Sequence, residues 1–230
     1  MFYKKFKKWL FYKILRAMLW HYQSLIKKIK TIIIDHYGDK KLGIDTDDFV
    51  EFKNIPESFQ TGVYKDGRIF ASTGYQELGR LADYLKLAAN DVFIDFGCGK
   101  GRVVFFIANN KLKKVIGVEI KKELVEIALQ NKALLNPITP VEIIHEDAAK
   151  VDVHEGTVFF FYNPFGLMTF SKVLSNIKES FKSHPRNIRI IYYNILYASL
   201  LDSHDWLERE TTIENGWGII RRNKADYNSA

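Results

Sequence analysis

The sequence contains one cysteine and, in its first 34 residues, no acidic side chain. A single cysteine, Cys98, excludes an intrachain disulfide and gives no basis for a cysteine-ligated metal site. The histidines show no metal-ligand spacing such as H-x-x-x-H, so we expect no bound metal. The longest uncharged run of the first segment, Ala17 to Ile26, is far short of the roughly 20 apolar residues of a membrane-spanning helix. No small-residue cleavage site of a signal peptide follows it, and we expect a cytoplasmic protein.

Charge is distributed unevenly along the chain. The net charge is +7, but residues 1–34 carry nine lysines and arginines and no acid, so 7 minus 9 leaves −2 for the remainder. A basic surface is what supplies affinity for a phosphate backbone. The slightly acidic remainder therefore argues against nucleic acid as the partner.

The first segment predicts one or two amphipathic helices, because apolar residues recur at helical spacing from Phe6 to Ile32. Two interpretations remain open. The helix packs on the body or on a partner chain with its lysines outward, or it lies on anionic lipid at the inner face of a membrane, with Trp9 and Trp20 at the headgroup level. We expect residues 1–45 to form this extension and residues 46–230 one domain, in which 46–90 cover its entry. Asp35 to Asp48 is polar and turn-rich.

A glycine-rich loop after a short apolar strand is the most informative stretch. Asp95 begins the pattern D-x-G-x-G-x-G, whose glycines are Gly97, Gly99 and Gly101. Glycine has no Cβ and tolerates positive φ, so such a loop brings its backbone close to a ligand. A dinucleotide fingerprint would need its third glycine at Arg102, and the P-loop pattern is absent.

This loop resembles the first motif of class I S-adenosylmethionine (SAM) methyltransferases. Glu119 ends the next apolar strand, at the place where nucleoside-binding α/β folds hold a ribose diol. By the resemblance, the acid after the third strand, Asp147, holds the adenine amino group, and Glu146 is the competing acid. Asp95 is expected to contact the amino group of the methionine portion, whose carboxylate the glycines and the following helix cradle.

The end of the fourth strand carries the predicted catalytic residues Asn163, Pro164 and Phe165. With Gly166 they resemble the Asn-Pro-Pro-aromatic motif of amino-group methyltransferases, although the aromatic here follows one proline instead of two. The Asn163 side-chain oxygen and the Pro164 carbonyl can accept hydrogen bonds from an amine and direct its lone pair at a methyl group. Phe165 can stack on a planar base or face an ammonium group.

A further segment before the first strand is expected to contribute to the site. Phe70 to Tyr75 resembles an aromatic-x-Pro-Thr-x-Tyr segment of bacterial methyltransferases, with Ser72 at the proline position. Thr73 has an alternative role as the N-cap of a helix from Tyr75 to Leu87, with Gln76 completing a capping box. The complete set of predicted cofactor-binding residues is Asp95, Gly97, Cys98, Gly99, Gly101, Glu119, Ile120, Asp147, Ala148, Asn163, Thr73 and Tyr75.

The resemblance covers residues 70–222 and implies a doubly wound, seven-stranded α/β sheet of order 3-2-1-4-5-7-6. Its last two strands form a hairpin around Asn215-Gly216, a strong turn signal. The chain looks like uncharacterised bacterial members and, more distantly, like non-SET lysine methyltransferases. We therefore predict an enzyme that uses SAM, releases S-adenosylhomocysteine and N-methylates a protein lysine or a small amine. The alternatives are an RNA or DNA base methyltransferase and a non-catalytic SAM-binding module at a membrane or in an assembly.

Overall fold

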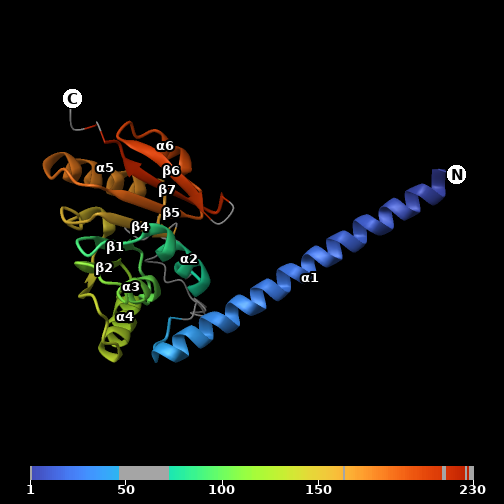
Figure 1. The fold of residues 1–230 in the computed structure, drawn as a ribbon, viewed down its shortest axis with the longest axis horizontal. Helices are drawn as coiled ribbons and strands as arrows, with labels where there is room; N and C mark the ends of the chain where they lie inside the picture. Colours follow the sequence, from blue (N-terminus) through green and yellow to red (C-terminus); the bar gives the residue numbers. More distant parts are fainter. Residues whose placement is uncertain (1, 47–72, 163, 214–215, 226, 228–230) are drawn as a thin grey trace, which may run out of the picture.

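The computed structural model describes residues 2–46, 73–162, 164–213, 216–225 and 227. Its centre is a seven-stranded sheet of order β3-β2-β1-β4-β5-β7-β6, as the sequence predicted (Figure 1). The strands β1 to β5 run parallel, and β7 is antiparallel to both β5 and β6. The bounds are β1 (Val92–Phe96), β2 (Lys114–Glu119), β3 (Val141–His145), β4 (Val158–Tyr162), β5 (Arg189–Tyr193), β6 (Leu207–Ile213) and β7 (Gly218–Asn223). The terminal hairpin is thus confirmed, while Asn215 of its expected turn lies outside the described residues.

Helices cover both faces of this sheet, which explains why the central strands β1 and β4 are buried along almost their whole length and, apart from Asp95, consist of apolar and aromatic residues. Alternate side chains of β4 enter opposite cores: Phe159 and Phe161 pack in one, and Phe160 packs in the other. The first core includes one face of α5, and the second includes α2 and α3. The helix bounds are α2 (Tyr75–Leu85), α3 (Arg102–Ile107), α4 (Lys122–Leu134), the 3-10 turn η3 (Ala148–Lys150), α5 (Leu167–Ser183) and α6 (Ala198–Asp202).

The first segment is one helix, α1 (Phe2–Leu42), most of which projects away from the body (Figure 1). The expectation of turns from Asp35 onward is therefore wrong as far as Leu42. The helix ends at Gly43, where φ is +72°. Gly43 N–H donates to the Lys40 carbonyl and Ile44 N–H to the Asp39 carbonyl, which is the hydrogen-bond pattern of a Schellman cap.

Gly38 explains how the last turns of α1 approach the body. A Cβ built on Gly38 would lie 2.5 Å from Cδ2 of the Tyr75 ring, so only glycine lets α2 come this close. The polar side chains at this end of α1 form hydrogen bonds and ion pairs with residues of the body, which are described below. In the described part of the chain, no helix combines the length and the apolar character needed to cross a bilayer.

Candidate functional site

The glycine loop connects β1 to α3 at the carboxyl edge of the parallel strands. Gly97 and Cys98 donate their N–H groups to the Val118 carbonyl of β2, at 2.8 and 3.0 Å. Gly97, Gly99 and Gly101 all have positive φ, a conformation that other residues rarely adopt. A Cβ on Gly97 would also overlap the Cβ of Pro164, so the tip of β4 lies directly against the loop. The loop needs glycine here for both reasons.

Glu119 is the residue that holds this loop. Its carboxylate is buried, and Oε2 accepts the Gly99 N–H at 3.0 Å. Oε1 accepts the N–H groups of Ile120 and Lys121, each at 2.9 Å. A carboxylate offers about four lone-pair positions, so these three bonds leave about one acceptor for a further hydroxyl. The predicted contact with a ribose therefore remains compatible with the geometry, although Glu119 is also a structural part of the loop.

Two carboxylates share this buried edge. Burial, and then the negative charge of Glu119, raise the pKa of Asp95 well above its usual range. Burial first, then the charges of Asp95 and Glu119, likewise raise the pKa of the Cys98 thiol. A cation placed at this edge would favour the ionised form of Asp95. The electrostatics therefore suit a ligand that brings positive charge, such as an ammonium or sulfonium group.

The end of β3 lies beside the end of β2, because Glu119 and His145 are partners in the sheet. Asp147 caps η3: its Oδ1 accepts the Ala149 N–H at 3.0 Å. Glu146 is exposed, and its Oε1 accepts the Asp147 N–H at 2.8 Å. Ala148 is buried behind them. Both acids thus lie at the expected edge of the sheet, and their contact with an adenine remains a prediction.

The predicted catalytic tip of β4 is described in part. Asn163 lies outside the described residues. Pro164 contacts Gly97, as shown above. Phe165 is half-buried, and its ring centroid lies 6.1 Å from that of Phe161 and 6.2 Å from that of Phe170. Phe165 therefore packs at the margin of the core, and its contact with an acceptor remains a prediction.

In the structure Thr73 does not cap α2, and the backbone N–H of Tyr75 is bonded to α1. The N-cap of α2 is Gly74, so the capping box of Thr73 with Gln76 is wrong. The Tyr75 N–H is instead satisfied by Asp35 Oδ1 of α1, at 2.9 Å. Thr73 is buried, and its hydroxyl has no hydrogen-bond partner among the described residues. The helix also ends two residues earlier than expected, at Leu85.

Tyr75 points its hydroxyl toward α1. The hydroxyl donates to Asp39 Oδ1 at 2.6 Å, and the Arg102 guanidinium lies 5.1 Å from the ring centroid. Burial, followed by the bond to Asp39, raises the pKa of Tyr75. Tyr75 is thus engaged in joining α1 to the body, and a direct contact with a cofactor remains a prediction.

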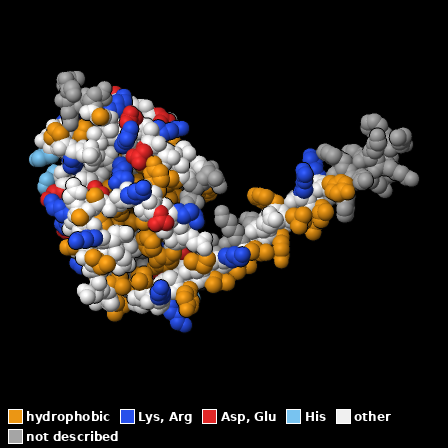
Figure 2. Space-filling view, viewed as in Figure 1, with side chains coloured by type: hydrophobic (Ala, Val, Ile, Leu, Met, Phe, Trp, Pro, Cys, Tyr) orange, Lys and Arg blue, Asp and Glu red, His pale blue; other side chains and the backbone are white. Residues whose placement is uncertain are grey.

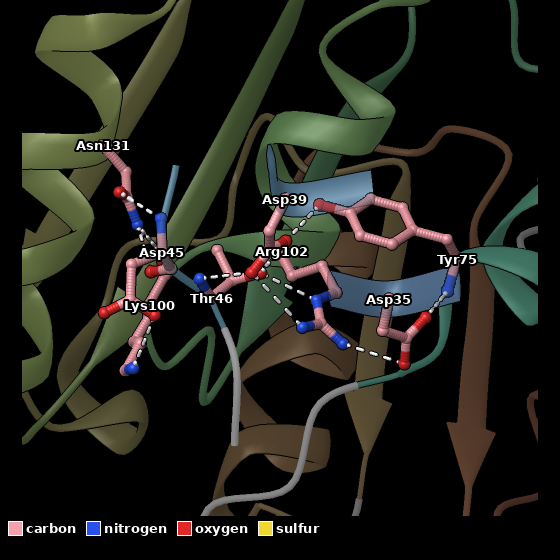
Figure 3. Close-up of polar contacts among 8 residues, drawn as sticks. All are labelled: Asp35, Asp39, Asp45, Thr46, Tyr75, Lys100, Arg102 and Asn131. Atoms are coloured by element: carbon pink, nitrogen blue, oxygen red, sulfur yellow. Dashed lines mark hydrogen bonds and ion pairs between the residues drawn. The ribbon is translucent and has the colours of Figure 1, made fainter. Parts of the chain in front are cut away.

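Sequence reasoning missed a buried ion-pair network around Arg102 (Figure 3). Arg102 Nε donates to Thr46 Oγ1 at 2.7 Å and Nη1 donates to Asp35 Oδ2 at 3.2 Å. Its Nη2 lies 3.5 Å from Asp39 Oδ2. One available signal was the spacing of Asp35 and Asp39, the first acids of the chain, which places them on one helix face. The network joins α1 to the residue that follows the glycine loop.

A second set of contacts holds residues 44–46, called the strap below, against the glycine loop. Asn131 of α4 donates its amide to the carbonyls of Asp45 and Lys100, at 2.8 and 3.1 Å, and accepts the Asp45 N–H. The Lys100 ammonium lies 3.1 Å from Asp45 Oδ1 (Figure 3). The carboxyl-terminal end of the glycine loop, at Lys100 and Arg102, is therefore held by Asp45 and Thr46.

Comparison with known proteins shows what the central part of the chain is similar to. Residues 87–191 match the family model of a methyltransferase domain. A protein-lysine N-methyltransferase of Saccharolobus islandicus is 27% identical over 114 residues, which is 49% of this chain and 65% of that protein. An uncharacterized RNA methyltransferase of Bacillus cereus is 38% identical over 104 residues, which is 45% of this chain and only 19% of that protein. The chain therefore spans less than two thirds of each relative.

Solved structures agree in fold. A dimethyladenosine transferase from Plasmodium falciparum superposes with a TM-score of 0.50 at 13% identity, covering 67% of this chain and 62% of the other. An RNA methyltransferase from Salinibacter ruber, solved with S-adenosyl-L-homocysteine, gives a TM-score of 0.49 at 21% identity over 66% of this chain and 92% of the other. The Bacillus cereus relative is named as an RNA methyltransferase, so the comparisons do not support our expectation that nucleic acid is an unlikely acceptor.

Proposed function

We propose that the chain transfers a methyl group from SAM to an amine nitrogen, and that the domain with the seven-stranded sheet, whose residues 87–191 match a methyltransferase family model, carries out this transfer. The observation that carries this proposal is the buried pair Asp95 and Glu119 beside a loop of three positive-φ glycines. The loop admits a ligand backbone at close range, the acids favour positive charge, and Glu119 retains an acceptor for a hydroxyl. SAM has all three complementary features.

The residues of the site have distinct roles in this proposal. When bound, SAM would supply an electrophilic methyl group, which would pass from sulfur to the amine nitrogen with S-adenosylhomocysteine as the leaving group. Asp95 holds the methionine ammonium, Glu119 holds the ribose, and Asp147 receives the adenine amino group. Asn163 accepts hydrogen bonds from the acceptor amine and orients its lone pair along the line of displacement. Pro164 supports this orientation because it keeps the tip of β4 against Gly97.

A protein lysine or a small amine is the acceptor that we favour. The support is the Asn163-Pro164-Phe165-Gly166 sequence and the similarity to a protein-lysine N-methyltransferase. An RNA acceptor is the second candidate, because the Bacillus cereus relative has the higher identity, 38%, over a similar length. Residues 35–230 are slightly acidic in total, so they offer little general electrostatic attraction to the phosphate backbone of an RNA.

Calorimetric titration with SAM, S-adenosylhomocysteine and NAD tests the cofactor. We expect both sulfur nucleosides to bind and NAD to be rejected; binding of NAD, or of none of the three, would contradict the proposal. The acceptor is then sought with labelled SAM and cell extract. Label on protein that survives mild alkali supports an N-methyl product, since methyl esters hydrolyse there. Label lost on ribonuclease treatment would instead identify RNA as the acceptor.

A further inference from the structure

The part of α1 that projects from the body exposes several apolar side chains along its length (Figure 2). Six described residues of one helix face are exposed by between 40% and 62%: Tyr12, Leu15, Leu19, Tyr22, Ile29 and Ile33. At 3.6 residues per turn, their positions fall within an arc of about 100° on the helix. Single exposed apolar residues are ordinary, but an aligned row over six turns indicates a surface that is covered by a partner.

The charge around this face indicates the chemistry of the partner. Arg16 and Lys30 lie at the margins of the arc, Lys13 lies on the opposite side, and all three are exposed. No acidic residue accompanies the nine basic residues of positions 1–34. Helices with a broad apolar face, a basic remainder and no acids lie in the interface of anionic membranes, where long basic side chains reach the headgroups.

A second copy of the chain is a poorer match for the same face. With Tyr12, Leu19 and Ile33 at a positions, the flanking e positions are Arg16, Gln23 and Lys30. Coiled-coil partners are selected by opposite charges at such flanking positions. Two copies of α1 would bring eighteen basic residues together, nine from each, with no acid before Asp35 to compensate. An anionic surface removes this repulsion and a second copy increases it.

We propose that the segment Tyr12–Ile33 of α1 is a docking surface for anionic lipid. The apolar face enters the boundary between headgroups and acyl chains, and the basic residues contact lipid phosphate. The opposite end of α1 is tied to the body through Asp35, Asp39 and Arg102. The methyltransferase domain is thereby held beside the membrane surface. This inference does not depend on the proposed methyl transfer.

The test is flotation of the full chain with vesicles of phosphatidylcholine alone and with added phosphatidylglycerol. We expect binding to the anionic vesicles, much weaker binding to phosphatidylcholine, and loss of binding at high salt. Arg16→Gln combined with Lys30→Gln, the two exposed basic residues at the margins of the arc, should weaken binding about 25-fold, because each basic residue near an anionic surface contributes about fivefold. Equal binding to both vesicles would contradict the charge argument.

Two neighbouring positions give a matched pair for the apolar face. Leu19 lies in the arc, whereas Trp20 lies outside it, and both are exposed, by 51% and 65%. Leu19→Gln should weaken vesicle binding about fivefold. Trp20→Gln should leave it within about twofold, because a position outside the arc turns this side chain away from the lipid, in place of the headgroup position that the sequence suggested for it. Circular dichroism checks that both variants keep the helix. Equal effects of the two variants would overturn the proposed face.

Sedimentation velocity on the same proteins distinguishes a second copy of the chain from lipid as the partner of this apolar face. A wild-type chain that stays monomeric without lipid and floats with anionic vesicles supports the proposal. A chain that ignores vesicles but self-associates, and becomes monomeric with Leu19→Gln, would replace lipid by a second copy. A monomer that does not float with any vesicle would overturn the proposal outright.

Discussion

Arg102 and Asp35 are 67 positions apart in sequence, yet Arg102 Nη1 donates to Asp35 Oδ2 at 3.2 Å, and both side chains are largely buried. Arg102 is also the first residue of the helix that follows the glycine loop. The contact therefore fixes the end of α1 against the predicted cofactor site, with Asp39 and Thr46 completing the set of partners.

Replacing Arg102 by alanine should destabilise the protein strongly. The change leaves the Asp35 and Asp39 carboxylates buried without their cation, which costs about 3–5 kcal/mol in comparable buried pairs. The measurement is the free energy of unfolding in urea. Arg80→Ala is the control, because Arg80 forms an exposed pair with Glu77 worth at most about 1 kcal/mol. If the two variants lose similar stability, the network does not anchor α1.

Gly97→Ala should abolish SAM binding and destabilise the fold. The new Cβ would overlap Pro164 and sit on a backbone with a φ of +79°. Gly79→Ala is the matched control: Gly79 lies within α2, and a Cβ there meets nothing within 4 Å. That variant should gain about 0.5–1 kcal/mol, since alanine favours the helix interior. Thermal unfolding and SAM titration measure both effects, and a tolerated Gly97→Ala would show that the loop adapts.

The affinity for SAM should rise with pH through the raised pKa of Asp95. Burial and Glu119 favour the protonated form of Asp95 in the free protein, and a bound cation favours the ionised form. Binding should therefore release a proton, which calorimetry in buffers of different ionisation enthalpy detects. Asp95→Asn should remove both the proton release and its pH dependence. Proton release that persists in Asp95→Asn would assign it to another group.

The same shift predicts an opposite effect on the stability of the free protein. A folded pKa raised above the unfolded value means that the contribution of Asp95 is present below its unfolded pKa and is lost as pH rises through its folded pKa. Asp95→Asn should therefore stabilise the ligand-free protein more at pH 8 than at pH 4. Urea unfolding at the two pH values checks this, and an equal change at both would contradict it.

Asn163→Ala should separate binding from catalysis. We expect SAM to stay bound, with a small loss of affinity because Asn163 is also among the predicted cofactor-binding residues, while methyl transfer to the acceptor falls at least about 100-fold because the amine loses its alignment. Titration and turnover with labelled SAM on the same preparation give the two quantities. Activity near that of the wild type, with SAM bound, would exclude the catalytic assignment.

The strand order and the glycine loop could be predicted because they depend on local patterns. Short apolar runs such as Val158 to Tyr162 identify buried strands, and an acid followed by alternate glycines identifies the turn after β1. The resemblance supplied the order in which these strands pair. The elements that were predicted wrongly depend on contacts between residues that are distant in sequence.

The end of α1 illustrates that failure. Asp35 to Asp48 contains five aspartates and two glycines, which favour turns in isolation. Its first part is helical because Arg102 compensates Asp35 and Asp39, and because Tyr75 packs on Gly38. Likewise, the N-terminus of α2 is satisfied by Asp35 and not by the local Thr73. No sequence window around either segment contains its partner.

The strap of residues 44–46 also constrains the order in which the chain can assemble. Its hydrogen bonds reach residues 56 and 86 positions later, at Arg102 and Asn131. During synthesis α1 is made before its partners Tyr75 and Arg102, and Asn131, which holds Asp45, is made later still. Contacts of such long separation are formed late, since a long loop must close before they contribute. The docking of residues 44–46 is therefore expected to be a late step of folding, and the glycine loop, already held by Glu119 and Val118, gains its contacts at Lys100 and Arg102 only then.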